Sequence, residues 1–248
     1  IKFFRKIRQN LLMENKTEKY FKYAFGEIVL VVIGILIALS INNWNENRKA
    51  QSLGQENYLN LLTSLEQDSI TVQKIIELNI IGLDALRKII PLEKNVELLE
   101  LSEENINQYL LKFGYAGRSF IPKSGVYNLL TSNNGFDLIK SVKIKSLLIN
   151  LYDYQYKAYE DLDSEIDYKY HNQLGLIVRE KIGVVLEFKP ELSILQGTSP
   201  ELFKKHYLEL AAKSRGIYGM LSYNKNTLVG IEQSINELIF LIREEIKK

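Results

Sequence analysis

The chain has 248 residues, of which 46% are hydrophobic and 25% are charged, as in an ordinary globular protein. Lysine and arginine number 32 against 30 aspartates and glutamates, so the net charge of +2 gives no reason to expect nucleic acid as a partner. Cysteine is absent, which excludes disulfides, thiolate metal sites and thiol catalysis.

The first element that we expect is a transmembrane helix over residues 24–44. Residues 24–41 read AFGEIVLVVIGILIALSI, an apolar run long enough to cross roughly 30 Å of hydrocarbon. Basic residues are frequent in residues 1–23 and sparse just after the run, so the positive-inside rule predicts a cytoplasmic N-terminus. The alternative is a cleaved secretory signal, which the small residues Ala38 and Ser40 would suit.

The juxtamembrane arm, residues 1–23, mixes Phe3, Phe4 and Ile7 with basic residues in a helical pattern. This pattern is typical of a segment that lies on the anionic cytoplasmic face of a membrane. The alternative is a plain topology signal with no specific lipid contact.

Two features of the predicted span suggest more than anchoring. Small residues at multiples of four, continued by an amide, predict a face for packing against another helix: Gly26, Gly34, Ala38 and Asn42. Glu27 is an intramembrane acid and therefore a candidate proton or partner site, although it could instead reach the nearby interface or a lysine.

Beyond the span, residues 45–248 predict one all-α domain, an elongated bundle of three long helices plus a short broken helical pair. The first long helix should end at Pro91, and the span could run straight on into it. Its predicted seam follows steps of four and three: Tyr58, Leu62, Leu65, Ser69, Val72, Ile76, Asn79, Leu83, Leu86 and Ile90.

The last long helix should begin at Ser199, because Pro200 and Glu201 follow a capping serine. Its seam has the same spacing and includes two polar positions, Ser214 and Asn224. The predicted seam positions are Phe203, Tyr207, Leu210, Ser214, Ile217, Leu221, Asn224, Leu228, Ile231, Ile235, Leu238 and Ile242.

The third long helix should cover residues 142–182. The short pair falls between the first and third helices, with one helix capped by Ser102 and ending near Lys112, and another over residues 126–131. Residues 183–199 are interpreted as a loop, although a hairpin could hide there.

Catalytic and metal signatures are weak throughout. His171 and His206 each lack a second ligand at helical spacing, and the acidic residues 160–167 are more typical of a solvated helix face than of a cation site. We therefore expect no enzyme activity, no cofactor and no metal.

An aromatic group offers the best candidate for a partner or ligand surface. Tyr152, Tyr156 and Tyr159 share one helix face, and residues 113–125 form an expected exposed turn with Tyr115, Arg118 and Phe120. Aromatic walls with hydroxyl tips build many ligand pockets, but they also line the edges of bundle cores.

Residues 26–46, GEIVLVVIGILIALSINNWNE, resemble the anchor of a family of uncharacterised single-span membrane proteins of Bacteroidota. Residues 127–139, followed by Leu147, Leu148 and Tyr152, match a second family stretch more loosely, with two asparagines inserted before Gly135. The family is labelled a domain of unknown function. The resemblance implies a bacterial inner-membrane protein with a periplasmic domain, and it implies no activity.

The sequence thus predicts a non-enzymatic scaffold that is anchored in the lipid bilayer and binds itself or another envelope protein. The alternative is a sensor-like bundle that binds a small ligand and signals through a partner membrane protein.

Overall fold

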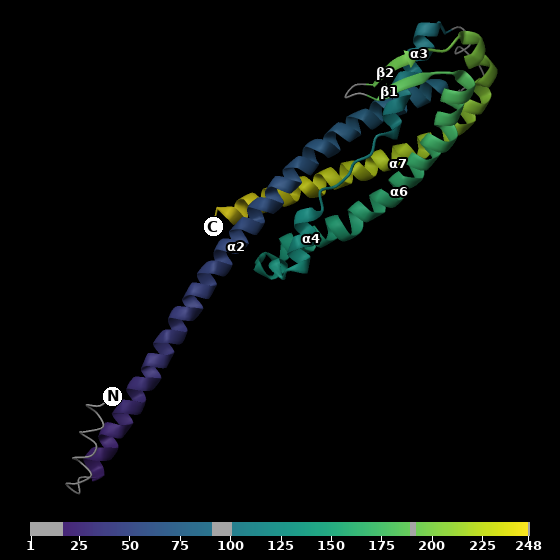
Figure 1. The fold of residues 1–248 in the computed structure, drawn as a ribbon. Helices are drawn as coiled ribbons and strands as arrows, with labels where there is room; N and C mark the ends of the chain where they lie inside the picture. The colour runs from purple at the N-terminus through teal and green to yellow at the C-terminus, as the bar shows by residue number, and fades with distance from the viewer. Residues whose placement is uncertain (1–16, 91–100, 189–191, 248) are drawn as a thin grey trace. The chain divides into compact units, whose positions relative to one another are not determined.

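The computed structural model describes residues 17–90, 101–188 and 192–247, and almost all of these are helical (Figure 1). The predicted all-α class is confirmed apart from one small hairpin. The elements are α2 (Thr17–Ile89), α3 (Glu103–Phe113), η2 (Gly114–Gly117), α4 (Gly125–Ser132), η3 (Gly135–Leu138), α5 (Val142–Ile149), η4 (Asn150–Gln155), α6 (Tyr156–Lys169), η5 (Tyr170–Leu174), η6 (Ile177–Ile182), β1 (Val185–Phe188), β2 (Leu192–Gln196) and α7 (Pro200–Ile246).

Internal contacts group the chain into two units, Ile1–Gly54 and Gln55–Lys248, and α2 contributes residues to both. α2 is assigned as one helix without interruption, as the sequence allowed. The basic arm falls mostly on residues 1–16, which lie outside the described residues.

Within Gln55–Lys248, α6 and α7 lie side by side with the second half of α2 (Figure 1). α7 begins where the sequence predicts, because Ser199 accepts a hydrogen bond from the Leu202 amide and Pro200 needs no amide partner. All twelve predicted seam positions of α7 are buried.

The buried face of α2 differs from its predicted seam at four of ten positions. The other six are buried as expected: Tyr58, Leu65, Val72, Asn79, Leu86 and Ile90. Four are only partly buried, because the positions one residue earlier face the core instead: Leu62, Ser69, Ile76 and Leu83. The positions that replace them are Leu61, Asp68, Ile75 and Gly82.

The third long helix covers residues 142–182 without a break, so this prediction is confirmed. Its hydrogen bonding is irregular, because η4, η5 and η6 are π-helical segments, which the sequence did not reveal. Gly183 ends the helix with φ 84°, a left-handed conformation that favours glycine.

Residues 185–196 correct the interpretation of this region as a loop. β1 and β2 pair antiparallel, with Phe188 opposite Leu192 and Val185 opposite Gln196. An isolated hairpin is marginal in water, and this one gains stability by packing on α3 and η2 near Gly114. The contacts that stabilise the hairpin therefore come from residues distant in the chain, and the local sequence pattern does not reveal them.

Two hydrophobic cores fill the bundle. One surrounds Leu61, Leu148 and Leu238, and the other surrounds Leu86 and Leu210.

Gly82 marks a close approach between α2 and η2. A Cβ atom there would lie 2.8 Å from the backbone nitrogen of Ala116.

We therefore expect Gly82→Ala to lower the free energy of unfolding by about 1–3 kcal/mol despite the better helix propensity of alanine. Gly230→Ala on α7 is the control, since nothing lies within 4 Å of its Cβ. It should raise stability by about 0.5–1 kcal/mol. Denaturant unfolding measures both, and equal effects would contradict the packing described.

Candidate functional site

The aromatic residues of the predicted surface lie in the bundle interior. Tyr152, Tyr156 and Tyr159 are 5%, 3% and 1% exposed, and Phe120 is 2% exposed. Only Tyr115 and Arg118 of the six candidates are partly accessible. The six therefore do not form one exposed wall, and the alternative interpretation as a core edge describes them better.

Two of the three tyrosine hydroxyls donate hydrogen bonds to carboxylates. Tyr156 Oη donates to Asp68 Oδ2 at 3.0 Å, and Tyr159 Oη donates to Asp163 Oδ1 at 2.9 Å. Hydrogen bonds to ionised acceptors are among the stronger ones in proteins. The tyrosine face of α6 thus connects α6 to α2 and stabilises its own turns.

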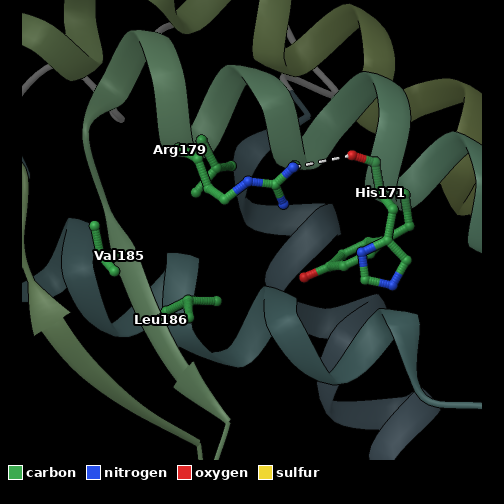
Figure 2. A pocket seen from close by; sticks show the side chains of 7 residues that line it. His171, Arg179, Val185 and Leu186 are labelled. Atoms are coloured by element: carbon green, nitrogen blue, oxygen red, sulfur yellow. Dashed lines mark hydrogen bonds between the residues drawn. The ribbon is translucent and has the colours of Figure 1, made fainter.

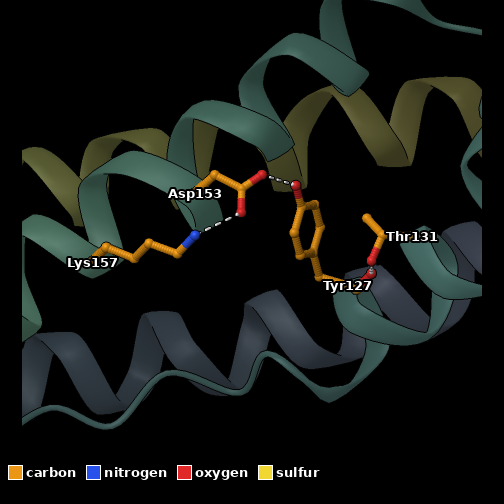
Figure 3. Close-up of polar contacts among 4 residues, drawn as sticks. All are labelled: Tyr127, Thr131, Asp153 and Lys157. Carbon is orange, nitrogen blue, oxygen red and sulfur yellow. Dashed lines mark hydrogen bonds and ion pairs between the residues drawn. The ribbon is translucent and has the colours of Figure 1, made fainter.

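A third pair lies at the edge of the same group. Tyr127 on α4 donates to Asp153 Oδ2 at 2.6 Å, and Lys157 binds the other oxygen of Asp153 at 3.3 Å (Figure 3). Thr131 donates back to the Tyr127 carbonyl at 3.2 Å (Figure 3). These bonds attach α4 to the π-helical segment η4.

Asp68 was not predicted as a site residue, yet it holds the segment before α4 in place. Its side chain is fully buried, and its two oxygens accept from the Lys123 amide at 3.1 and 3.2 Å. Ser64 donates to the Lys123 carbonyl at 3.0 Å. One feature of the sequence indicates that Asp68 is buried: it lies three residues after Leu65, at core spacing on α2.

Within the expected exposed turn of residues 113–125, residues 118–124 instead form a strap that is bound across the bundle. Besides the Lys123 contacts, the Phe120 amide donates to Tyr159 Oη at 2.9 Å. The Phe120 ring lies 5.6 Å from the ring of Tyr156 and 5.9 Å from that of Tyr159. A chain segment without regular structure must satisfy its backbone groups, and the buried side chains provide the partners.

Burial changes the pKa values of the carboxyl groups and tyrosine hydroxyls beneath the strap. Desolvation raises the pKa of Asp68 and of Asp163 above the usual range, although the hydrogen bonds from Tyr156 and Tyr159 oppose the change. Desolvation and the nearby carboxylates also raise the pKa of the Tyr156 and Tyr159 hydroxyls. Phenols whose pKa is raised stay protonated at neutral pH and do not supply a phenolate as nucleophile or base, so the arrangement suits fastening of helices better than catalysis.

The bundle also contains a small pocket of about 90 Å³ between the end of the third long helix and β1. Its lining combines three aliphatic side chains with the rings of Tyr170 and His171, and the Arg179 guanidinium donates to the His171 carbonyl at 3.3 Å (Figure 2). Ligand pockets for drug-sized molecules are several times larger. Only a group of a few heavy atoms would fit.

Metal ligands do not gather in the part of the chain that the structure describes. Within residues 17–90, 101–188 and 192–247, no group of three or more His, Asp and Glu side chains could hold an ion. His171 pairs with Asp167 at 3.2 Å on an exposed helix face.

The predicted packing face of the span is uncovered in the unit Ile1–Gly54. A Cβ at Gly26 or Gly34 would meet nothing within 4 Å, Ala38 is exposed, and Asn42 donates to Glu46 at 3.0 Å within α2. A four-residue step turns a helix by about 40° beyond a full turn. Gly34, Ala38 and Asn42 therefore form one winding stripe, whereas Gly26 lies well to its side. Glu27 is partly exposed.

Tyr156→Phe tests the contact between α2 and α6. Loss of the hydroxyl removes a buried hydrogen bond to a carboxylate, so we expect the free energy of unfolding to fall by about 1.5–3 kcal/mol. Tyr154→Phe is the control, because Tyr154 is 69% exposed and should change stability little. Chemical denaturation followed by circular dichroism measures both variants, and a Tyr156→Phe value as small as the control would refute the role given to Asp68.

The pH dependence of stability should separate Asp68 from Asp153. The folded-state pKa of Asp68 is raised, so its protonation favours folding, and its contribution is lost as pH rises through that pKa. The hydrogen bond from Tyr127 lowers the pKa of Asp153, so its contribution is lost as pH falls through that pKa.

We therefore expect the stability of the unsubstituted protein relative to Asp68→Asn to increase on acidification from about pH 7 to pH 4, and that relative to Asp153→Asn to decrease on further acidification below about pH 4. Denaturant midpoints across this range provide the measurement. Parallel pH profiles for the two variants would contradict the assignment.

The chain was also compared with known proteins. One family profile, described as a family of unknown function (DUF6090), matches residues 27–192, which include the strap and the tyrosine–carboxylate pairs. No curated protein and no solved structure matches. The resemblance to a family without a known activity is confirmed, while the bacterial phylum and the single-span anchor stay predictions. Because the match covers more than half of its residues, the chain belongs to the DUF6090 family of unknown function.

Proposed function

We propose that this protein is a membrane-anchored interaction protein. Its N-terminal helix spans the bacterial inner membrane with the N-terminus in the cytoplasm. The helical domain lies in the periplasm, where it binds a second copy of the chain or another envelope protein. It performs no chemistry on a substrate.

The observation that carries the proposal is the complete exposure of the apolar part of α2. One helix near the N-terminus is long and apolar enough to cross a membrane, and none of its most apolar stretch is buried. Phe25, Leu30 and Ile35 are 70%, 65% and 62% exposed. Apolar side chains on all faces of a helix need an apolar environment, which lipid supplies.

The charge distribution supports the orientation. Basic residues gather before the span, and Asn, Glu and Trp follow it. The same basic residues would attract anionic lipid at the cytoplasmic face.

An interaction role for the domain is supported by its use of polar groups. Tyr156 and Tyr159 are bonded to Asp68 and Asp163, so these hydroxyls are committed to internal contacts. Large apolar side chains meanwhile remain exposed along α7: Leu208, Tyr223 and Phe240 are 78%, 67% and 63% exposed. Such residues are suited to contacts with another protein.

The sensor alternative is supported by the pocket beside Arg179. It could accept a small anion or a short acyl group, since one guanidinium lies among aliphatic side chains. Its small volume makes it the weaker candidate.

The proposal predicts that the intact protein, extracted in mild detergent, is an oligomer or carries a stoichiometric partner. Size-exclusion chromatography with light scattering gives the mass of the complex, and mass spectrometry identifies its chains. A monomer without a co-purifying chain would contradict the proposal.

Substitutions in the span can locate the contact. If the stripe packs against another helix, Gly34→Leu should reduce the oligomer or the bound partner, because a large side chain keeps the helices apart. Ile35→Leu is the control, since it conserves volume at an exposed neighbouring position. If both variants retain the oligomer or the bound partner to the same extent, the contact lies in the helical domain instead.

A further inference from the structure

A buried amide without a hydrogen-bond partner lies in the middle of the bundle. Asn79 on α2 is fully buried, and neither its Nδ2 nor its Oδ1 has a partner within the described chain. Nearly all buried polar groups in native proteins are bonded. An amide that lacks both partners is therefore a costly feature, and it calls for a physical explanation.

Asn79 lies at the boundary between the two hydrophobic cores. On α2, Leu78 packs against the first core and Leu83 against the second. On α7, Leu221 belongs to the second core and Leu228 to the first, with the buried Asn224 between them.

α6 crosses the same boundary at Asp163. Tyr159 belongs to the first core and Ile166 to the second, and Asp163 lies between them. Asn224 Nδ2 donates to Asp163 Oδ1 at 3.1 Å. The boundary is thus polar on α6 and α7, as it is on α2.

The antiparallel pairing of α2 and α7 brings Asn79 level with Asn224. Gln73 bonds Glu232 at 2.7 Å on one side of the boundary. Tyr207 bonds the Ile89 carbonyl at 2.9 Å on the other side. Asn79 lies between Gln73 and Ile89, and Asn224 lies between Tyr207 and Glu232. The three side chains Asn79, Asp163 and Asn224 therefore form one polar layer across the bundle.

The helix that carries Asp163 is bounded by irregular segments on both sides. η4 (Asn150–Gln155) precedes α6, and η5 (Tyr170–Leu174) follows it. A π-helical segment interrupts the regular ladder of backbone hydrogen bonds, and such segments often occur where helices change conformation. The end of α6 from Asp163 to Lys169 can therefore shift by a small rotation at η5, while Tyr156 and Tyr159 keep their bonds to Asp68 and to the Phe120 amide.

We propose that the polar layer of Asn79, Asp163 and Asn224 is a joint between the two halves of the bundle. In the state described, Asp163 is bonded to Tyr159 and Asn224, and Asn79 has no partner. In a second state, the end of α6 (Asp163–Lys169) shifts at η5, and Asn79 gains a partner in the layer. The unpaired amide keeps the first state from being much more stable than the second. This inference concerns residues 55–248 alone and does not depend on membrane attachment.

Hydrogen–deuterium exchange on the full chain in detergent tests the joint. The amides at the end of α6, Asp163–Lys169, should exchange together and at least about tenfold faster than those of α7 between Ile217 and Ile235. Equal protection of α6 and α7 would overturn the proposal without the use of any variant.

Asn79→Leu provides the second test. A leucine there removes two unpaired polar atoms and joins the two cores, so the melting temperature should rise and exchange in α6 should slow by about tenfold. A rise in melting temperature with unchanged exchange of α6 relative to α7 would show a static layer that fixes helix register, and it would overturn the joint. A fall in melting temperature would show that Asn79 is already paired, and it would also overturn the joint.

Ser214→Ala is the matched control. Ser214 is also fully buried with an unpaired hydroxyl in the described chain, but it lies within the second core and away from the layer. This variant should raise the melting temperature slightly and leave the exchange of α6 unchanged. If Ser214→Ala slowed α6 as much as Asn79→Leu, the effect would be one of general stability, and the layer would have no special role.

Discussion

The fold of residues 55–248 depends on the way in which one buried carboxylate is satisfied. Asp68 is fully buried on α2, and a buried charge is tolerable only when hydrogen bonds replace its water. Its partners are the Lys123 amide of the strap and the hydroxyl of Tyr156 on α6. Through these two bonds a single side chain fixes α2, the strap and α6 to one another. The ring contacts of Phe120 and the attachment of α4 follow from the position of the strap.

The polar layer at Asn79 represents the opposite case. Asp68 obtains all its partners from other elements, whereas Asn79 obtains none within the described residues. The bundle therefore contains one polar site that rigidifies it and another that weakens it. Both lie on the buried face of α2, and they differ only in whether neighbouring elements supply donors and acceptors. This contrast divides the bundle into a tightly fastened half around the strap and a half that meets it across a weak boundary.

Helix positions could be predicted from the sequence to different degrees. α7 was predicted in full, because its capping serine, proline and apolar spacing are local signals and its partners cover one continuous face. The seam of α2 was predicted correctly at six of its ten positions. Asp68 and Gly82 occupy core positions there, and neither looks like a core residue until the strap and η2 are placed against them. The preference for Ser69 over Asp68 followed from hydrophobicity alone.

The hairpin, the π-helical segments and the strap could not be predicted for a related reason. Each depends on contacts between residues distant in the chain, such as that between Phe120 and Tyr159. The tyrosine face was recognised as special, but two of its three hydroxyls bond to carboxylates of the same protein. Sequence spacing shows that three tyrosines share a helix face, and it does not show whether that face meets a ligand or the protein's own core.

The absence of cysteine allows a direct test of membrane topology. Single cysteines can be introduced at Phe21, which is 71% exposed before the span, and at Tyr223, which is 67% exposed on α7. Both should be labelled by a membrane-impermeant maleimide in detergent. In cells with a permeabilised outer membrane and an intact inner membrane, the proposed function predicts labelling of Tyr223→Cys and protection of Phe21→Cys. Labelling of both or of neither, or the reverse pattern, would contradict a single span with a periplasmic domain.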